Sequence, residues 1–360
     1  MCYVNKIYVF IILFFLIASI SIGQTVFYNA EQFPLIGKIS EETETRYERL
    51  PAYLRDKSRE PVWALGKNTA GLAIRFRSNS TSISAKWDVL NNRSMQHMTN
   101  LGIKGLDLYA WENNQWRFVN SARPKGKKNE ATIIESMESV EREYMLFLPL
   151  YDGVTSLFIG IDSCKTIGQP VLKYPDTTNP IIVYGTSITQ GCSASRPGMA
   201  YTNMLMRWFN REVINLGFSG NGRLDYEIAE LIGSKKNASL IILDNAPNGS
   251  PSSIGERTFP FVEIIRKHKP QTPIIIVENM EYADIKFNTK KRDFWQRKNN
   301  SVHSQYLELI KQGYKDIYYL DHENLIGDDG EGTVDGTHFT DLGFYRFANA
   351  LVEKIKTIKQ

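Results

Sequence analysis

The feature that most constrains this fold is a change of hydrophobic pattern at a polar, proline-containing stretch, residues 173–180. Before it, from about residue 70 to residue 162, apolar and polar residues alternate in short segments separated by turns, which is typical of antiparallel strands without intervening helices. After it, five short, fully apolar runs alternate with amphipathic segments, a pattern typical of parallel strands that helices cover on both faces. The sequence therefore predicts a β-sandwich or jelly-roll domain over residues 24–174 and an α/β domain over residues 175–360.

The α/β part can be divided further. Its helices are expected near residues 200–210, 224–232, 261–268, 302–311 and 340–358, and in the last of these the apolar residues recur on one helical face. The strands are expected at the apolar runs Ile181–Tyr184, Val213–Leu216, Leu240–Leu243, Pro273–Val277 and Ile317–Leu320.

The first 23 residues have the pattern of a secretory signal peptide. Lys6 precedes an uncharged apolar run, Ile7–Ile20, and the small residues Ser21 and Gly23 precede a plausible cleavage point before Gln24. An uncleaved membrane anchor is the alternative, although the run is short for a bilayer span. The sequence thus predicts a secreted or periplasmic protein that has no stable membrane insertion after cleavage.

Charge and cysteine content indicate which binding partners and which covalent links can be expected. The chain has 43 Lys and Arg residues against 39 Asp and Glu residues, with no long block of like charges, so neither nucleic acid nor an anionic membrane is expected as a partner. Cys164 and Cys192 remain after signal cleavage, and they could pair in an oxidising compartment or serve as small buried residues. The oligomeric state is left open.

In a doubly wound sheet, reactive groups lie beyond the carboxyl ends of the strands. Ser187 follows the first apolar run, after a glycine that allows a sharp exit from the strand. A serine hydroxyl is a weak nucleophile without a base and without donors for the oxyanion that forms. The donors predicted for this oxyanion are the backbone N–H groups of Ser187 and Gly220 and the side-chain amide of Asn248, which follow the first three runs.

The base is expected beyond the fifth run. Asp335 and His338 lie three residues apart on a loop, so the carboxylate can fold back onto one imidazole nitrogen while the other faces the serine. Each piece alone is common, because a serine after a strand often caps a helix and Asp-x-x-His often forms a turn. Here four separate strand ends each supply a group that acyl transfer needs, and this combination favours a catalytic site over an unrelated cap and turn.

These segments resemble the SGNH (GDSL-like) hydrolases, which are named for Ser, Gly, Asn and His, matched here by Ser187, Gly220, Asn248 and His338. Residues 105–109, Gly-Leu-Asp-Leu-Tyr, resemble the Gly-x-Asp-Leu-Tyr mark of an N-terminal β-domain in one subgroup. The resemblance covers nearly the whole chain beyond the expected signal peptide. It implies a flavodoxin-like three-layer domain, ester hydrolysis through an acyl-enzyme with no cofactor or metal, and an oxyanion hole made by the three donors above.

Two positions depart from the family pattern. Thr186 and Ile188 stand where the Gly-Asp-Ser-Leu string has Asp and Leu, which leaves open how the turn at Ser187 is braced. The third segment reads Pro-Asn instead of Gly-x-Asn-Asp, so Asn248 stays in register without its usual neighbour.

His322, which follows the fifth run, is the one serious alternative to His338 as the base. Residues 328–331, Asp-Asp-Gly-Glu, lack the alternating ligands of a calcium loop, and a solvated turn is expected there. The remaining histidines are expected in the β-domain, at a solvated helix end and on a helix surface: His97, His268 and His303.

The substrate is predicted from weaker signals. A loop over residues 278–296 interleaves aromatic and basic residues and should border the site, so Tyr282 and Trp295 are candidates for stacking on a sugar, with loop packing as the alternative. Arg196 is expected either to contact substrate or to brace its loop through an ion pair. No long apolar insertion is present to cap a fatty-acyl site. These signals favour a small acyl ester, above all the acetyl groups of a glycan.

Two other functions remain open at this point. The same serine, histidine and aspartate would serve a phospholipid or lysophospholipid acylhydrolase. Alternatively, the chain could be a glycan-binding protein that has lost turnover, for which Thr186 in place of Asp gives some support.

Overall fold

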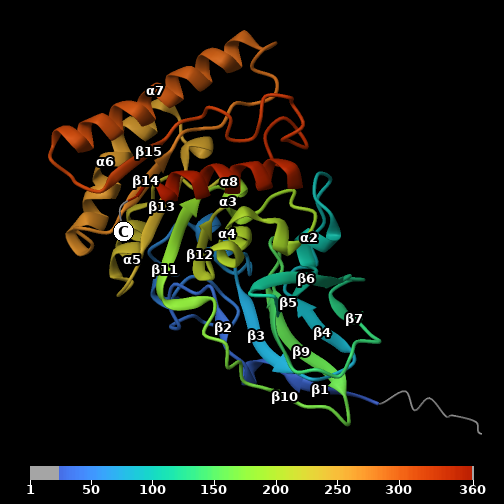
Figure 1. Cartoon of the computed structure of the whole chain (residues 1–360). Coiled ribbons are helices and arrows are strands. Elements are labelled where there is room, and N and C mark those ends of the chain that lie inside the picture. Colours follow the sequence, from blue (N-terminus) through green and yellow to red (C-terminus); the bar gives the residue numbers. More distant parts are fainter. Residues whose placement is uncertain (1–23, 359–360) are drawn as a thin grey trace, which may run out of the picture.

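The computed structural model describes residues 24–358, which form three β-sheets with helices (Figure 1). The predicted signal peptide, residues 1–23, lies outside the described residues. The N-terminal half, residues 24–168, holds two antiparallel sheets, and the C-terminal half, residues 176–358, holds one parallel sheet. The change from antiparallel to parallel pairing falls at the polar stretch where the sequence pattern changes, so the predicted fold class is confirmed. The division into two domains stays a prediction.

The two antiparallel sheets pack face to face. The four-stranded sheet has the order β1 (Thr25–Asn29), β9 (Val154–Asp162), β4 (Ile83–Val89) and β7 (Lys128–Ile134). The six-stranded sheet has the order β10 (Ile167–Gly168), β3 (Ala73–Ser78), β8 (Arg142–Phe147), β5 (Leu106–Glu112) and β6 (Gln115–Ala122), and β2 (Leu35–Ile36) pairs with β3.

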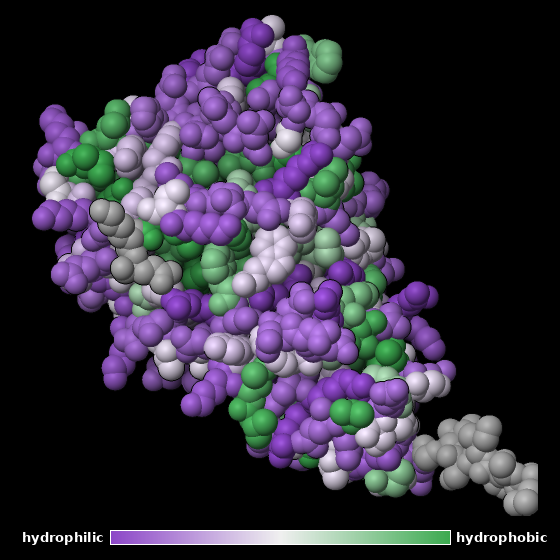
Figure 2. Space-filling model, viewed as in Figure 1, coloured by the Kyte–Doolittle hydropathy of each residue, from purple (hydrophilic) through white to green (hydrophobic). Residues whose placement is uncertain are grey.

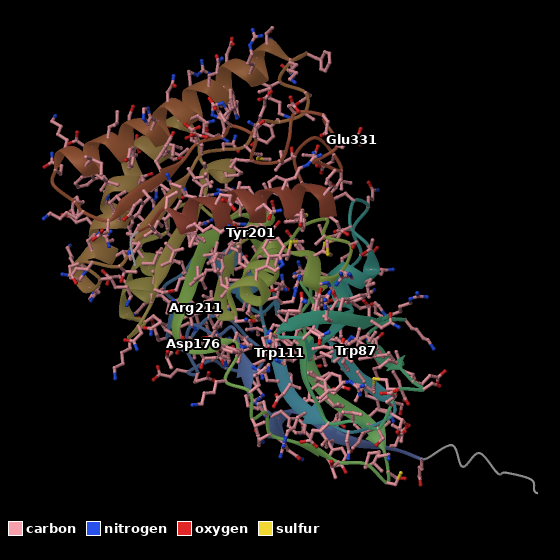
Figure 3. All side chains as sticks on the ribbon, in the orientation of Figure 1. Trp87, Trp111, Asp176, Tyr201, Arg211 and Glu331 are labelled. Atoms are coloured by element: carbon pink, nitrogen blue, oxygen red, sulfur yellow. The ribbon has the colours of Figure 1, made fainter. Side chains whose placement is uncertain are left out.

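Alternation along the strands builds the core between these sheets. Ile74 and Phe76 of β3 face Ala85 and Trp87 of β4, because residues two apart on a strand point to the same side. Trp87 lies among the strands of this half (Figure 3). Its ring is buried, and its indole N–H donates to the Lys104 carbonyl at 2.9 Å, so the large side chain has its polar atom satisfied.

The parallel sheet has the order β12 (Arg211–Gly217), β11 (Asp176–Gly185), β13 (Leu240–Asp244), β14 (Ile274–Val277) and β15 (Ile317–Leu320). This is the flavodoxin-like order, in which the chain leaves β11 at the point where the winding reverses. The five strands coincide with the five predicted apolar runs. The C-terminal half also contains α3 (Ser187–Gln190), α4 (Tyr201–Phe209), α5 (Tyr226–Ser234), α6 (Pro251–His268), α7 (Thr289–Lys311) and α8 (Asp341–Lys356).

Two helices begin well before their predicted starts. Helix α6 starts at Pro251, where Ser250 and Ser253 form a reciprocal capping box, and it continues through Pro260. Helix α7 starts at Thr289, where the Asn288 side chain accepts from the Lys291 N–H. The first turns of α7 are polar and basic and carry no apolar stripe, so the prediction of a loop as far as residue 296 is wrong from Thr289 onward.

Several elements of the N-terminal half were not predicted. They lie outside the clearly alternating segments: strands β1, β2, β7 and β10, helices α1 (Glu60–Gly66) and α2 (Asn100–Lys104), and the 3-10 turns Ala30–Gln32 and Ala52–Leu54. Two further 3-10 turns, Pro197–Met199 and Ala246–Asn248, belong to the C-terminal half.

The two halves share cores on both faces of the parallel sheet. Ile181 and Val183 of β11 point to one face, where α4 and α8 pack together with residues of the six-stranded sheet such as Phe147. Ile182 and Tyr184 point to the other face, where α5, α6 and part of α7 pack together with Leu50 and Val62 of the N-terminal half. The N-terminal half therefore covers both faces of the sheet that carries the site.

The face of the molecule in Figure 2 is mainly hydrophilic, with apolar side chains gathered in small patches. Within residues 24–358, no helix has both the length and the apolar character needed to cross a bilayer.

Candidate active site

Ser187 lies at the turn between β11 and α3, at the winding reversal of the parallel sheet. Thr186 caps α3: its hydroxyl accepts from the Ile188 N–H at 3.3 Å, and the Thr189 hydroxyl accepts from the Thr186 N–H at 3.3 Å. Thr186 is fully buried. The threonine that replaces the family's Asp thus braces the turn through hydroxyl groups, without a charge.

A buried polar cluster lies beneath this turn. The Asp244 carboxylate, at the end of β13, accepts from the Thr189 hydroxyl at 2.8 Å and from the Tyr201 hydroxyl at 2.9 Å. Tyr201 lies on α4 near α8 (Figure 3). Burial raises the pKa of Asp244 to about 7, while these two hydrogen bonds oppose the rise. The cluster ties the helix of the Ser187 turn to the neighbouring strand.

His338 and Asp335 lie on the loop that leads to α8. The Asp335 carboxylate contacts its histidine twice: Oδ1 accepts from the His338 backbone N–H at 2.8 Å, and Oδ2 lies 2.8 Å from Nδ1 of the imidazole. The other ring nitrogen, Nε2, lies 3.0 Å from Ser187 Oγ. Hydroxyl, imidazole and carboxylate therefore form one hydrogen-bonded line.

The protonation of this pair follows from its surroundings. Burial alone would lower the pKa of His338, but the Cys192 sulfur and the Asp335 carboxylate outweigh it and raise that pKa to about 9. Burial would likewise raise the pKa of Asp335, but its hydrogen bonds from the His338 ring and backbone lower it to about 2. The aspartate is therefore ionised at any ordinary pH, and the neutral imidazole gains as the pH rises toward 9.

The other predicted oxyanion donors border the same turn. Gly220 has a φ of +69°, which favours glycine, and a Cβ built there would have no atom within 4 Å outside the neighbouring residues. The side-chain oxygen of Asn248 accepts from the Gly222 N–H at 3.1 Å, which leaves the side-chain NH₂ group free to donate to another acceptor. Gly222 is itself constrained, since a Cβ there would lie 2.3 Å from the Gly185 carbonyl oxygen. The donor roles of Ser187, Gly220 and Asn248 stay predictions.

The alternative base has a different partner. Nδ1 of His322 lies 2.6 Å from Glu278 Oε2, and its ring packs edge-on against Trp295 with a centroid separation of 4.7 Å. Of the histidines that the structure describes, it is His338 whose ring nitrogen is within hydrogen-bond distance of Ser187 Oγ. The acidic turn at residues 328–331 is held by an ion pair in which both Asp329 oxygens lie 2.8 Å from the Arg346 guanidinium.

One residue near the site was missed from the sequence. His97 comes from the N-terminal half, yet its ring stacks on the His338 ring at 5.1 Å, and its Nε2 lies 3.3 Å from Cys192 Sγ. Cys192 is buried and Cys164 is exposed, and neither is paired within the residues that the structure describes. His97 stands in an irregular stretch after β4, and no periodic pattern signals its position.

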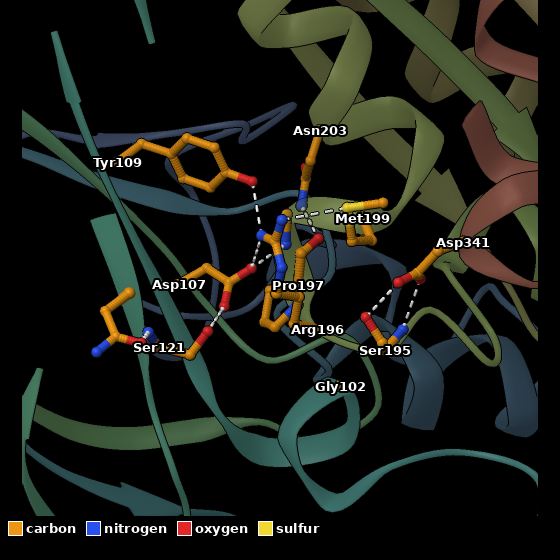
Figure 4. Close-up of polar contacts among 12 residues, drawn as sticks. Gly102, Asp107, Tyr109, Ser121, Ser195, Arg196, Pro197, Met199, Asn203 and Asp341 are labelled. Carbon is orange, nitrogen blue, oxygen red and sulfur yellow. Dashed lines mark hydrogen bonds and ion pairs between the residues drawn. The ribbon is translucent and has the colours of Figure 1, made fainter. Parts of the chain in front are cut away.

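Arg196 makes the bracing contact that the sequence left open as an alternative (Figure 4). Its guanidinium lies 2.8 Å from Asp107 Oδ2 and donates to the Tyr109 hydroxyl at 2.7 Å. The same Asp107 oxygen accepts from the Gly198 N–H at 2.7 Å. Asp107 and Tyr109 are the Asp and Tyr of the Gly-Leu-Asp-Leu-Tyr segment, so this segment fixes the loop that follows Ser187. Substrate contact by Arg196 stays a prediction.

The two aromatic candidates for sugar stacking have packing roles. Tyr282 is 8% exposed and lies beneath Lys291, whose Nζ is 4.5 Å from the ring centroid. Trp295 is 7% exposed, lies on α7 and donates from its indole N–H to the Asn279 and Met280 carbonyls. Little of either ring is free, so stacking on a substrate stays a prediction.

The N-terminal half also forms hydrogen bonds with the turn that carries Ser187. The Tyr151 hydroxyl donates to the Ser187 carbonyl at 3.2 Å. The Gln190 side chain bridges the two halves, because its amide donates to the Leu150 carbonyl at 3.1 Å while its oxygen accepts from the Ser219 N–H at 3.0 Å. The Ser187 turn and the Gly220 loop are thereby held against one segment of the N-terminal half.

Comparison with known proteins agrees with this architecture. A family profile described as GDSL-like lipase/acylhydrolase matches residues 178–356, and one described as the N-terminus of SGNH-hydrolase-type esterases matches residues 25–167. The crystal structure of a GDSL-like lipase from Bacteroides ovatus is 38% identical, with a TM-score of 0.88, covering 93% of this chain and 99% of that chain. The chain belongs to the GDSL-like lipase/acylhydrolase family. It is an ester hydrolase of the SGNH type.

More distant structures share the fold of this acylhydrolase. A salicylyl-acyltransferase from a tetracycline biosynthetic pathway is 17% identical, with a TM-score of 0.74, covering 93% of this chain and 97% of that chain. A family two carbohydrate esterase from Cellvibrio japonicus is 14% identical, with a TM-score of 0.58, covering 93% of this chain and 98% of that chain. No curated protein matches the chain.

Proposed function

We propose that this acylhydrolase is a serine esterase that removes short acyl groups, above all acetyl, from a carbohydrate. Ser187 is the nucleophile, His338 is the general base, and Asp335 orients the imidazole and stabilises its protonated form. The observation that carries the proposal is the hydrogen-bonded line with separations of 2.8 Å from Asp335 to His338 and 3.0 Å from His338 to Ser187. These distances suit proton transfer without rearrangement.

The reaction then has two steps, formation of an acyl-enzyme and its hydrolysis. Neutral His338 takes the Ser187 proton as the oxygen attacks the ester carbonyl, and Asp335 stabilises the imidazolium that forms. The backbone N–H groups of Ser187 and Gly220 and the Asn248 amide receive the charge on the carbonyl oxygen. The imidazolium returns its proton to the leaving alcohol, and water, deprotonated by His338, hydrolyses the acyl-enzyme in the same manner.

The walls around the oxyanion residues favour a polyol over a long acyl chain. A hollow of about 660 Å³ that includes Asn248 is lined by charged and hydroxyl side chains, among them Arg59, Arg223, Asp225 and Ser250. A second hollow of about 640 Å³ beside the Gly220 loop has a mixed lining, in which Tyr151 and Ser219 lie together with Leu65 and Met95. Because buried polar groups need partners, the polar walls of the first hollow suit sugar hydroxyls better than methylene groups. The carbohydrate esterases that share the fold lend this substrate class further support.

The test is acetate release from a panel of acetylated polysaccharides, measured for the wild type and for Ser187→Ala. We expect release by the wild type from at least one polysaccharide and a loss of about 10⁴-fold or more in Ser187→Ala. On model esters, hydrolysis of p-nitrophenyl acetate should exceed that of p-nitrophenyl octanoate. Faster cleavage of the octanoate, or release from lysophospholipids alone, would contradict the short-acyl substrate and favour a lipid acylhydrolase.

We also propose export from the cytoplasm, on the pattern of residues 1–23. Fractionation followed by N-terminal sequencing checks this directly, and the mature chain should begin at Gln24. Recovery of the intact chain in the membrane fraction would point to an anchor instead.

A further inference from the structure

We propose that His97, Cys192 and His338 form a binding site for one thiophilic divalent cation, zinc(II) above all, which shuts off the esterase by occupying its base. The metal site stands on its own geometry. Its effect on turnover rests on the proposed role of His338.

The three side chains come from separate segments and converge on one point. His97 lies in the N-terminal half, Cys192 follows α3 and His338 precedes α8. One ligand atom from each, two imidazole nitrogens and a sulfur, lies within 4.8 Å of the other two. The closest recorded separation is 3.3 Å, between His97 Nε2 and Cys192 Sγ. Tetrahedral zinc spaces such ligand atoms roughly 3.3–3.6 Å apart, so small side-chain rotations complete the site.

The donor set selects the metal. A thiolate and two imidazoles suit zinc and other borderline-soft cations, whereas magnesium and calcium require oxygen ligands. When the metal binds, the Cys192 thiol and any protonated imidazole give their protons to solvent, so that a thiolate and two neutral imidazoles hold the ion. Three protein ligands leave the fourth position open to water.

The surroundings of the cluster favour a fixed site. Asp335 already holds Nδ1 of His338 at 2.8 Å, which is the carboxylate–histidine arrangement that orients metal-binding imidazoles. The Cys192 backbone N–H donates to the Ser187 carbonyl at 2.8 Å, which fixes the start of the loop that carries the sulfur. The His97 and His338 rings are stacked with an interplanar angle of 20°, so one ring has to turn before both nitrogens point at the same ion.

Metal binding and catalysis exclude one another in this geometry. With Nδ1 turned to Asp335, Nε2 is the nitrogen of His338 available to a metal, and this same atom lies 3.0 Å from Ser187 Oγ. A neutral imidazole nitrogen has one lone pair, so it cannot hold zinc and accept the serine proton together. The resulting inhibition should be reversed by a chelator.

The experiment measures binding first, because binding does not depend on the substrate being known. The metal-stripped full chain is titrated with zinc chloride by calorimetry, and with cobalt(II) in an absorption spectrometer that detects a thiolate-to-cobalt charge-transfer band. The variants are Cys192→Ala, Cys192→Ser, which keeps the side-chain size, and His97→Gln. Cys164→Ala, at the exposed cysteine, is the matched control. Circular dichroism establishes that each variant is folded.

We expect one zinc per chain and the cobalt band in both the wild type and Cys164→Ala. Both Cys192 variants should lose the band, and they and His97→Gln should bind zinc at least about tenfold more weakly. Unchanged zinc affinity in the folded Cys192 and His97 variants, or a cobalt spectrum without the thiolate band, would overturn the metal site. If zinc binds as expected but the metal-free chain has no esterase activity, the proposed function fails and the metal site stands.

Discussion

The two halves of this acylhydrolase divide the work at the site unequally. The C-terminal half supplies every group proposed to touch the reacting ester, and these groups follow its parallel strands. The N-terminal half supplies contacts that hold those groups: the Tyr151 hydroxyl on the Ser187 carbonyl, and Asp107 on Arg196 and the Gly198 N–H. Strand ends therefore place the side chains proposed to react, whereas contacts with the N-terminal half hold the loops that carry them.

Arg49 shows the holding role most clearly. This side chain of the N-terminal half is buried, and its guanidinium donates to the Asn215 and Gly217 carbonyls of β12 as well as to the Leu65 and Asn68 carbonyls of its own half. Burial lowers the pKa of Arg49 to about 9. One cation therefore joins β12 to the N-terminal segment from within.

The largest effect should come from the C-terminal half. Replacing the base by His338→Ala should lower kcat/KM about 10⁴-fold or more with little change in unfolding, because the residue is partly exposed and acts on the reaction. His322→Ala is the matched control, because His322 also pairs with a carboxylate but packs against Trp295 instead of Ser187. This variant should lower kcat/KM by less than about tenfold. Equal losses in the two variants would contradict the assignment of the base.

The N-terminal half should show the reverse pattern. Arg49→Met removes four hydrogen bonds to backbone carbonyls, of which the Leu65 carbonyl keeps the Asn68 N–H, and should lower the free energy of unfolding by roughly 3 kcal/mol or more, measured in urea. Arg55→Met, at an exposed ion pair with Glu44, should change it by less than about 1 kcal/mol. A variant of Arg49 as stable as that control would show that the contact with β12 is dispensable.

The pH profile tests how Cys192, beside His338, changes the pKa of this histidine. Only neutral imidazole can accept the serine proton, so kcat/KM should rise with pH through the His338 pKa of about 9. Cys192→Ala removes one of the neighbours that raise this pKa and should shift the midpoint to lower pH, because burial then weighs more. Cys164→Ala should keep the wild-type midpoint. An unchanged midpoint in Cys192→Ala would show that the Cys192 sulfur does not raise the pKa of His338.

The smallest effect is expected at a single holding contact. Tyr151→Phe deletes one hydrogen bond to the Ser187 carbonyl, which contributes about 1 kcal/mol, so kcat/KM should fall by less than about tenfold. Steady-state kinetics on one ester checks this. A loss near that of His338→Ala would mean that the N-terminal half takes part in the chemistry itself.

The sequence predicted the parallel strands and the site residues for the same physical reason. Fully apolar runs mark strands buried on both faces, and the ends of parallel strands meet at one edge, so Ser187 and His338 could be paired from far apart in the chain. His97, Arg49 and Tyr151 could not be placed, because they lie in irregular stretches whose partners are fixed only by how the two halves pack. Helix α7 was predicted too short since its polar first turns have no apolar stripe.

We propose that His338, held by Asp335, activates Ser187. Labelling of the folded chain by a fluorophosphonate, with the modified peptide identified by mass spectrometry, tests this most directly. We expect stoichiometric labelling at Ser187, at a rate that is orders of magnitude lower in His338→Ala and unchanged in His322→Ala. Labelling at another residue, or labelling of Ser187 at the same rate without His338, would contradict it.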